Sequence, residues 1–243
     1  MRPLSPLSDW CSLEHSVAQI LTQQELHGWY FNERSAWELE SRLRKELEEL
    51  TKVLRDRYTF IAGSEFTPKR NNQTSGYIEG ATFTRLKELN PTSRDHIAWI
   101  LTTHYGWKPS LISSNGKPVI DEIVLKEIGT DISLQFLRCL ELKKALGMIS
   151  EGVNAWLKLC TTSSRIHHHC SVATNTFRCA HRKPNLGQVP AGEEFRKLFT
   201  ASPNLSMVGA DLSGIELRML AHYLARYDAV SYTHLTLPTS DLV

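Results

Sequence analysis

Apolar residues at helical spacing recur along much of the chain. The most regular run lies between residues 36 and 57, where one face is built from leucines and the other carries dense charge. This pattern predicts a long amphipathic helix that packs within its own chain. A coiled-coil dimer is the alternative, with only about three irregular heptads available for it. The leucines that form the face are Leu39, Leu43, Leu47, Leu50 and Leu54.

Weaker patterns predict the elements that flank this helix. Residues 14–27 have helical spacing and end before Gly28, which is a favoured helix C-cap. A short extended segment follows at residues 29–31. Residues 60–88 are polar and contain glycines, so we interpret them as a loop or a small insertion.

The pattern changes after a second long helix. Helical spacing resumes with Thr92 or Ser93 as an N-cap, and a turn-rich connection with one short helix leads to a long helix over residues 133–159. Residues 165–199 are irregular and hold short extended pieces. Later, residues 205–210 read as a strand that gives way to a helix. Helices first and strand-bearing segments afterwards predict an α+β fold.

Asp211 stands at this junction between the strand and a helix predicted over residues 215–227. Ser213 and Glu216 have the S-x-x-E spacing of a capping box, which gives Glu216 a structural explanation. Asp211 precedes the predicted cap by two residues, where its carboxylate can project beyond the sheet edge. A hard oxygen ligand in that place suits Mg²⁺. The residues alone leave a structural role and a ligand role of Asp211 both open.

Composition narrows the class of protein. The chain has 243 residues, 41% of them hydrophobic and 22% charged, and a net charge of +2, which excludes a strongly disordered protein. Charge is uneven, however. Residues 161–200 hold six Lys and Arg residues against two Glu, and this basic segment favours a polyanionic partner. No signal peptide and no apolar run of ~20 residues are found, so we expect no membrane association.

Cysteine and histidine usage offers a weak alternative. The 5 cysteines are odd in number and show no C-x-x-C spacing, so we expect a reduced, cytoplasmic protein. The run RIHHHC at 165–170, with Cys179 and His181 nearby, raises the possibility of a zinc-stabilised interaction protein. Its spacing fits no common structural zinc pattern, and successive side chains on an extended segment cannot all face one metal.

Several ordered segments resemble family A DNA polymerases, and in particular the branch of the podovirus-type phages. VGADLSGIELRMLAHYLARYD resembles motif A of this family, and RCAHRKPNLGQVP resembles its R-x(5)-P-N-L-x-Q-x-P segment. EEFRKLF resembles the arginine-containing stretch that follows. NPTSRDHIAWILTTHYGWKPSLISSNGKPVIDEIVL and EGVNAWL resemble the thumb of the phage branch. The resemblance extends over residues 14–228, and an ordered series is far more specific than one motif.

This resemblance implies a domain organisation. It implies a truncated right-hand fold, with a helical lead-in at residues 1–32, a mostly helical thumb at 33–160 and the start of the palm, including motif A, at 161–229. Residues 230–243 include VSYTHLTLPTS, which resembles the translation of a sequencing adapter, and are expected to be foreign to the protein.

The resemblance also implies roles in nucleotidyl transfer. Asp211 would be one of two aspartates that hold two Mg²⁺ ions, and the carbonyl of Leu212 would add an oxygen ligand. Glu216 would lie under the sugar of the incoming dNTP and exclude a 2′-hydroxyl. Arg196 would lie near the nucleotide phosphates. All four roles belong to extension of a primer 3′ end in DNA replication.

Four further residues are expected to contact primer-template DNA. Arg178, Asn185 and Gln188 match family positions at the minor groove, where acceptors are similarly placed for every correct base pair. Lys144 matches a thumb lysine that contacts the duplex backbone. A phenylalanine, Phe177, stands where the family has a glycine, which makes the placement of Arg178 less secure.

The sequence lacks other parts of the family pattern. No helix with the nucleotide-binding lysine and tyrosine and no H-D-E segment follow Asp211, and no paired exonuclease carboxylates precede the thumb. We therefore expect the 243-residue chain by itself not to polymerise DNA. Residues 60–88 are short for a processivity-factor insertion, so no such partner is predicted. A non-catalytic helical DNA-binding module is the alternative function.

Overall fold

The computed structural model describes residues 9–176 and 178–224, and the expected foreign tail at 230–243 lies outside them. Two compact units divide the chain, Met1–Thr200 and Ala201–Val243. The first unit contains α1 (Asp9–His27), β1 (Trp29–Phe31), α2 (Glu33–Arg57), β2 (Phe60–Phe66), β3 (Phe83–Glu88), α3 (Arg94–Tyr105), α4 (Glu122–Ile128), α5 (Asp131–Leu146), the π-helical turn η1 (Gly147–Glu151), α6 (Trp156–Leu159), β4 (Arg165–Ile166), β5 (His169–Ser171), β6 (Ala180–Arg182), the 3₁₀ turn η2 (Leu186–Gln188), α7 (Glu193–Arg196) and β7 (Phe199–Thr200).

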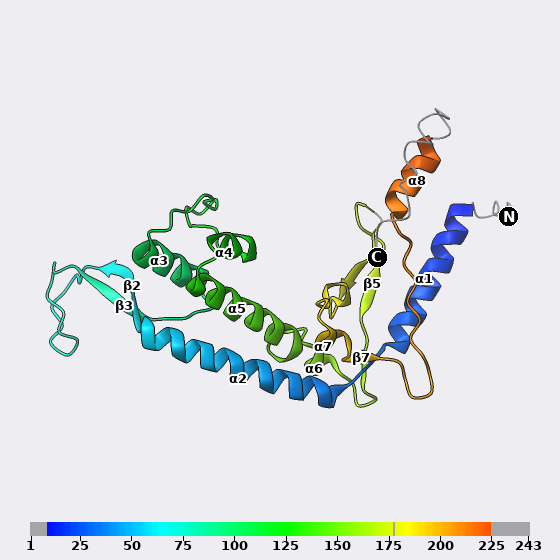
Figure 1. Cartoon of the computed structure of the whole chain (residues 1–243), viewed down its shortest axis with the longest axis horizontal. Coiled ribbons are helices and arrows are strands. Elements are labelled where there is room, and N and C mark those ends of the chain that lie inside the picture. The colour runs from blue at the N-terminus through cyan, green and yellow to red at the C-terminus, as the bar shows by residue number, and fades with distance from the viewer. Residues whose placement is uncertain (1–8, 177, 225–243) are drawn as a thin grey trace, which may run out of the picture. The chain divides into compact units, whose positions relative to one another are not determined.

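The long helices α2 and α5 pack side by side and form the axis of the first unit (Figure 1). The side chain of Asn32 caps α2 by accepting a hydrogen bond from the Ser35 amide at 3.1 Å. The leucine face of α2 is buried against other elements of the same chain, as predicted, because those leucines would otherwise leave a continuous apolar stripe in water.

Two hydrophobic cores lie along this helix pair. The first joins the C-terminal part of α2 to β2, α3, α4 and the first half of α5, with Phe136 fully buried in it. The second joins the first half of α2 to β1, η1 and the second half of α5, around Phe31, Leu142 and Trp156. Leu47 and Leu50 contact both cores and make them continuous along α2.

A buried carboxylate ties α2 to the turn that follows α5. Glu40 is nearly buried and accepts hydrogen bonds from Arg44 and, at 3.1 Å, from the Ser150 hydroxyl. Arg44 also contacts Glu151 at 3.2 Å, and Glu151 pairs with Lys143 at 2.6 Å. The hydrogen bond from Lys143 is the main reason that the pKa of Glu151 is lowered, and the hydrogen bond to Glu40 is the main reason that the pKa of Arg44 is raised.

Residues 60–88, interpreted as a loop or a small insertion, form an antiparallel hairpin of β2 and β3, so the loop interpretation was wrong. The strands pair from Phe60 with Glu88 to Phe66 with Phe83. Beyond them, the rings of Phe66, Tyr77 and Phe83 cluster, and the Arg85 guanidinium lies 3.9 Å above the Phe66 ring centroid. The polar composition concealed these strands because β3 is exposed along its whole length.

The second long helix is shorter than the predicted 133–159. α5 ends at Leu146, and η1 and the separate α6 follow it. Gly152 explains the break, because its amide donates to the Gly147 carbonyl at 2.9 Å and a Cβ on Gly152 would lie 2.5 Å from that oxygen. The chain therefore turns tightly here instead of continuing the helix.

Two small sheets complete the first unit. β1 pairs antiparallel with both β4 and β7, in the order β4-β1-β7, and so joins segments far apart in the sequence. The rings of Phe31, Trp156 and Phe199 pack together beside this sheet. β5 and β6 form a separate antiparallel hairpin. None of the helices in the described ranges combines the length and the apolar content that a membrane span needs.

The second unit contains α8 (Ile215–Leu224). The predicted strand at 205–210 is not formed, because a strand needs a hydrogen-bonded neighbour and no strand of the described ranges pairs with it. The predicted capping box is also wrong. α8 begins at Ile215, and Gly214, with a φ of 60°, stands directly before it, so Ser213 does not hold the cap position.

Candidate functional site

Two of the predicted DNA-contacting residues share one turn. The side chain of Asn185 caps η2 by accepting from the Gly187 amide at 3.1 Å, and the Gln188 amide donates to the Asn185 carbonyl at 3.3 Å. Both side chains are exposed. Because the Asn185 oxygen is engaged in the cap, its NH₂ group is the part of the side chain that is left to donate outwards.

Arg178 lies just before β6, on the exposed side of the hairpin loop. Its carbonyl accepts from the Thr174 hydroxyl at 3.0 Å, which ties the two sides of the loop together. Phe177, the predicted departure from the family glycine, lies outside the described residues. β6 connects Arg178 to the η2 turn, so Arg178, Asn185 and Gln188 lie on one continuous basic segment.

A histidine stack supports this segment from inside. The His181 ring lies against Gly187, where a Cβ would be 3.2 Å from the ring carbon Cδ2. His168 stacks on His181 with centroids 5.3 Å apart and an interplanar angle of 24°. The Nδ1 atoms of both rings are buried and have no hydrogen-bond partner among the described residues. Burial, followed by the nearby His181, lowers the pKa of His168, so this ring is neutral at pH 7.

The other histidines of the run RIHHHC anchor α1. His167 Nδ1 lies 2.8 Å from the Glu25 carbonyl oxygen, and His169 Nδ1 lies 3.0 Å from the Glu25 carboxylate. The first and third of the successive histidines thus contact Glu25, whereas the second, His168, stacks on His181. Within residues 9–176 and 178–224, no three His, Cys, Asp or Glu residues gather as a metal site, so the zinc alternative has no support there.

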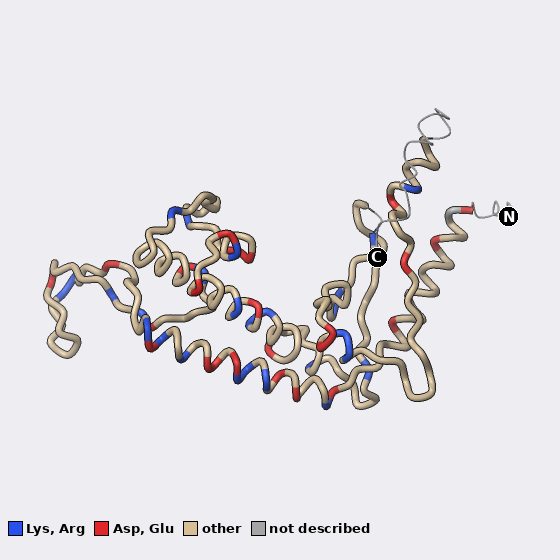
Figure 2. The backbone as a smooth tube through the Cα atoms, viewed as in Figure 1, with Lys and Arg blue, Asp and Glu red and all other residues tan. Residues whose placement is uncertain are grey.

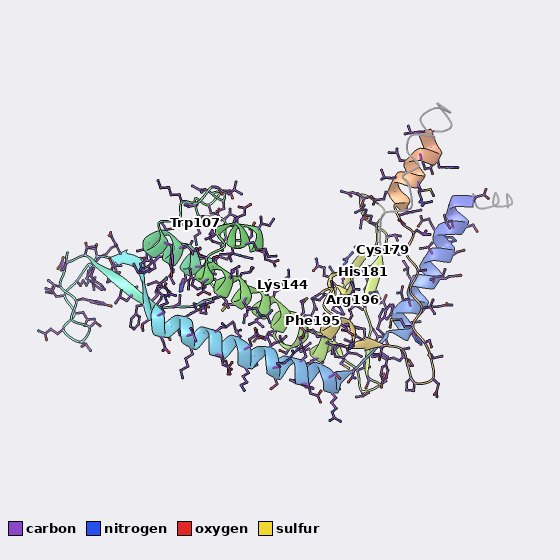
Figure 3. All side chains as sticks on the ribbon, viewed as in Figure 1. Trp107, Lys144, Cys179, His181, Phe195 and Arg196 are labelled. Carbon is purple, nitrogen blue, oxygen red and sulfur yellow. The ribbon has the colours of Figure 1, made fainter. Side chains whose placement is uncertain are left out.

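Lys144 projects from α5 and is well exposed (Figure 3). Its Nζ lies 3.2 Å from Glu122 Oε1 on α4. The pair borders a cavity of about 230 Å³ whose apolar lining includes Leu43 and Phe195. An exposed ion pair of this kind contributes only ~0–1 kcal/mol, so Lys144 can exchange Glu122 for a phosphate at little cost.

Arg196 lies in the last turn of α7, and Figure 3 shows its position next to Phe195. The Arg196 guanidinium is exposed and has no hydrogen-bond or ion-pair partner in the described part of the chain. An ion pair between Arg42 and Glu194 ties α7 to α2. α7 therefore presents a fixed position for an available positive charge.

Asp211, Leu212 and Glu216 all lie in the second unit and are exposed. Among the described residues, no group bonds to the Asp211 carboxylate, so the structure gives it no capping role. The Leu212 carbonyl accepts from the Ile215 amide at 3.3 Å and keeps a second lone pair. Glu216 lies in the first turn of α8. One carboxylate and one carbonyl fit Mg²⁺, which takes one or two carboxylates together with substrate phosphates.

Comparison with known proteins identifies the family. The family model for DNA polymerase family A matches residues 64–228, a span that contains every residue discussed as a candidate ligand or DNA contact. The chain belongs to DNA polymerase family A. This membership confirms the resemblance found in the sequence.

The DNA-directed DNA polymerases of Escherichia phage T7 and Enterobacteria phage T3 are both 30% identical to this family A chain, over 91% of its length and 40% of theirs. DNA polymerase I A of Arabidopsis thaliana chloroplasts and mitochondria is 44% identical over 24% of the chain. The chain thus spans about 40% of the length of the curated phage relatives. These relatives support the phage-type assignment.

A solved structure shows the fold. The POL domain of Pol1 from M. smegmatis, in complex with DNA primer-template and dNTP, matches 86% of this chain with a TM-score of 0.61, at 17% identity and over 33% of its own length. The mixed helix and sheet fold of the family A chain therefore resembles a polymerase domain.

Sequence reasoning missed the residues that support the site. The contact of His181 with Gly187 and the stack of His168 on His181 depend on the β5–β6 pairing, which joins residues far apart in the hairpin. From the sequence alone, the run of histidines indicates only a possible zinc site. The one signal in the sequence was that successive side chains of an extended segment point to opposite faces, so that the middle histidine of the run must face away from its two neighbours.

Proposed function

We propose that this chain provides the thumb, residues 33–160, and the first part of the palm, residues 161–229, of a template-directed DNA polymerase that extends a primer 3′ end in DNA replication. The family match over residues 64–228 carries the proposal, because it includes all the candidate site residues in one ordered series. The charge distribution agrees with it, since the basic segment of residues 161–200 suits a polyanionic partner.

Binding of primer-template DNA combines hydrogen bonds in the minor groove with a contact to the phosphate backbone. Arg178, the NH₂ group of Asn185 and Gln188 donate to minor-groove acceptors, whose similar placement in every correct base pair lets donors check geometry without reading sequence. Lys144 exchanges Glu122 for a backbone phosphate and adds affinity that falls with salt. The exposure of Asn185, Gln188 and Lys144 supports these roles.

Asp211 and the Leu212 carbonyl would hold Mg²⁺ in the proposed function, together with a second aspartate that the family pattern requires. The ions would supply charge neutralisation for nucleotidyl transfer. Arg196 binds the phosphates of the incoming dNTP as a fixed positive charge. Glu216 lies under the sugar, where its side chain in the first turn of α8 leaves no room for a 2′-hydroxyl.

Primer extension tests the incompleteness of the chain. We expect no extension by the purified 243-residue chain with Mg²⁺, dNTPs and a primer-template, because these residues supply only one of the two required aspartates. Extension that disappears in Asp211→Asn would contradict this part of the proposal. An Asp56→Asn variant, with the same change on the exposed face of α2, is the matched control.

A chimera tests the role of Asp211 directly. Residues of this chain would replace the matching segment of the Escherichia phage T7 polymerase, to which they align over 91% of the chain. We expect Asp211→Asn to lower primer extension by roughly 10³-fold or more, as for loss of a metal ligand, and Asp56→Asn to leave it unchanged. Equal activity of both variants would overturn the metal role, provided that the unsubstituted chimera is active.

A further inference from the structure

Two cysteines lie on one face of the β5–β6 hairpin, close to the proposed DNA contacts. Cys170 pairs with His181 across the hairpin, and Ser171 pairs with Ala180. Cys179 precedes His181 by two residues, so it shares the face of Cys170 and lies diagonally across from it. The Cys179 thiol is close enough to contribute to the raised pKa of Cys170, which agrees with this register.

The two thiols differ in access. Cys170 is 9% exposed, whereas Cys179 is exposed and directly follows Arg178. An oxidant in solution therefore reacts with Cys179 first. Cys170 is close enough to attack the modified Cys179 afterwards. The remaining thiols have no such partner among the described residues. They are Cys11 and Cys160, which are partly exposed, and Cys139, which is buried and whose pKa is raised by burial to about 11.

We propose that Cys170 and Cys179 are a reversible oxidation site, and that the disulfide formed between them weakens primer-template binding by displacing Arg178. The second half rests on the proposed function of Arg178. Diagonal positions on a hairpin have Cα atoms ~7–8 Å apart, whereas a disulfide requires ~4.4–6.8 Å. Closing the bond therefore draws the start of β6 towards β5, and the backbone of Arg178 moves with it.

The oxidant is a small-molecule disulfide such as oxidised glutathione. The Cys179 thiolate attacks one sulfur of the oxidant, its S–S bond breaks, and one glutathione thiolate leaves. The Cys170 thiolate then attacks Sγ of Cys179 and releases the second glutathione. The two protons of the protein thiols pass to the two glutathione thiolates, and the two protein sulfurs are oxidised while the oxidant is reduced.

Protonation controls the second step. Burial is the main cause of the raised pKa of the Cys170 thiol, and the nearby Cys179 thiol raises it further. The fraction of Cys170 thiolate is therefore small at neutral pH, and ring closure accelerates as the pH rises.

Mass spectrometry tests the site itself. The folded chain is treated with oxidised glutathione, trapped with N-ethylmaleimide and digested. We expect a Cys170–Cys179 linked peptide, a stable glutathione adduct on Cys179 in Cys170→Ser, and no link in Cys179→Ser. Cys11 and Cys160 should give mixed disulfides alone, and Cys139 should stay unmodified. Glutathione adducts on Cys11 and Cys160 without the linked peptide would overturn the proposal.

Binding measurements test the consequence. Fluorescence anisotropy with a labelled primer-template should show a Kd about five-fold higher for the oxidised chain, as for one misplaced charged hydrogen bond, and full recovery with dithiothreitol. Cys179→Ser, which can neither close the ring nor carry the adduct beside Arg178, should respond by less than about two-fold. Formation of the disulfide with no change in Kd would overturn the effect on binding. A reduced chain that binds no DNA would overturn the proposed function and the binding effect, whereas the linked peptide would still establish the oxidation site.

Discussion

The helix pair α2–α5 and the segment around α8 are both rich in apolar residues, yet only the first buries them. Leu43, Leu142 and Phe136 are almost inaccessible to water, whereas Leu217, Met219 and Leu220 of α8 are 44–49% exposed. Figure 2 shows acidic and basic residues interspersed along the whole of α2. In the first region, the apolar faces of the helices are therefore buried within the same unit.

This difference in burial shows which region is stabilised by packing among its own residues and which is not. Two long helices with complementary faces close a core by local packing, so the sequence pattern and the fold agree. The segment at 205–210 and the helix α8 have apolar residues in the right order for a strand and a helix, but no described strand pairs with the first and few residues cover the second. Their apolar surface is of the kind that another part of a polymerase domain would bury.

A matched pair of leucine substitutions should give the largest contrast. Leu142→Ala removes side-chain atoms from a fully packed site and should destabilise the first unit by about 2–5 kcal/mol. Leu220→Ala, at a site 49% exposed, should change the free energy of unfolding by less than about 1 kcal/mol. Urea unfolding followed by circular dichroism measures both. Similar losses for the two variants would refute the contrast between the regions.

The buried carboxylate of α2 should give the next largest effect. Arg44→Met leaves Glu40 with Ser150 as its remaining hydrogen-bond partner among the described residues and should cost about 2 kcal/mol, a value reduced because Arg44 is itself partly exposed. The double variant Glu40→Met with Arg44→Met should recover most of that loss, because no charge remains buried. Arg34→Met, at an exposed pair on the same helix, is the control. A double variant less stable than Arg44→Met would contradict this explanation.

Acidification should weaken the first unit through His168. Its pKa lies below the usual 6.5 in the folded chain, so below pH ~6.5 the unfolded chain binds the proton first and stability falls as the pH decreases. The largest slope from one proton is ~1.4 kcal/mol per pH unit. His168→Phe should reduce this slope to the part that comes from His96, whose pKa burial also lowers, whereas His222→Phe on the exposed α8 should keep it. Unfolding free energies measured from pH 7.5 to 5 decide between these outcomes.

Lysine substitutions on α8 should have the smallest effect on stability. Leu217→Lys and Met219→Lys replace half-exposed apolar side chains by another good helix former, so the free energy of unfolding should change by less than about 0.5 kcal/mol. Light scattering should show less aggregation, because the exposed apolar surface decreases. Unchanged aggregation would mean that another surface of the chain drives it.

The sequence predicted the parts of the fold that depend on local pattern. The leucine spacing identified α2 and its packing within the chain, and apolar periodicity located α1, α3 and the start of α5. The β2–β3 hairpin was missed because its exposed strands have no apolar alternation. The break after Leu146 was missed because it depends on a close backbone approach between Gly147 and Gly152.

The candidate site was predicted to a different extent. The residues of the basic segment and of motif A were identified because their order along the chain resembles that of the family. The family match over residues 64–228 confirms this resemblance. Their individual roles remain predictions. The contacts that support them, such as His168 on His181 or Cys170 beside Cys179, follow from strand register and could not be derived from spacing.

Binding of primer-template DNA tests the central claim most directly. A fluorescence-anisotropy titration of the 243-residue chain should give a Kd that rises steeply with salt, because phosphates are neutralised. It should rise by about five-fold or more for Arg178→Ala and for Gln188→Ala, and by less than about two-fold for Arg34→Ala on the far side of α2 from the leucine face. Equal affinities for all four proteins, or no binding at low salt, would contradict the assignment of the basic segment to primer-template DNA.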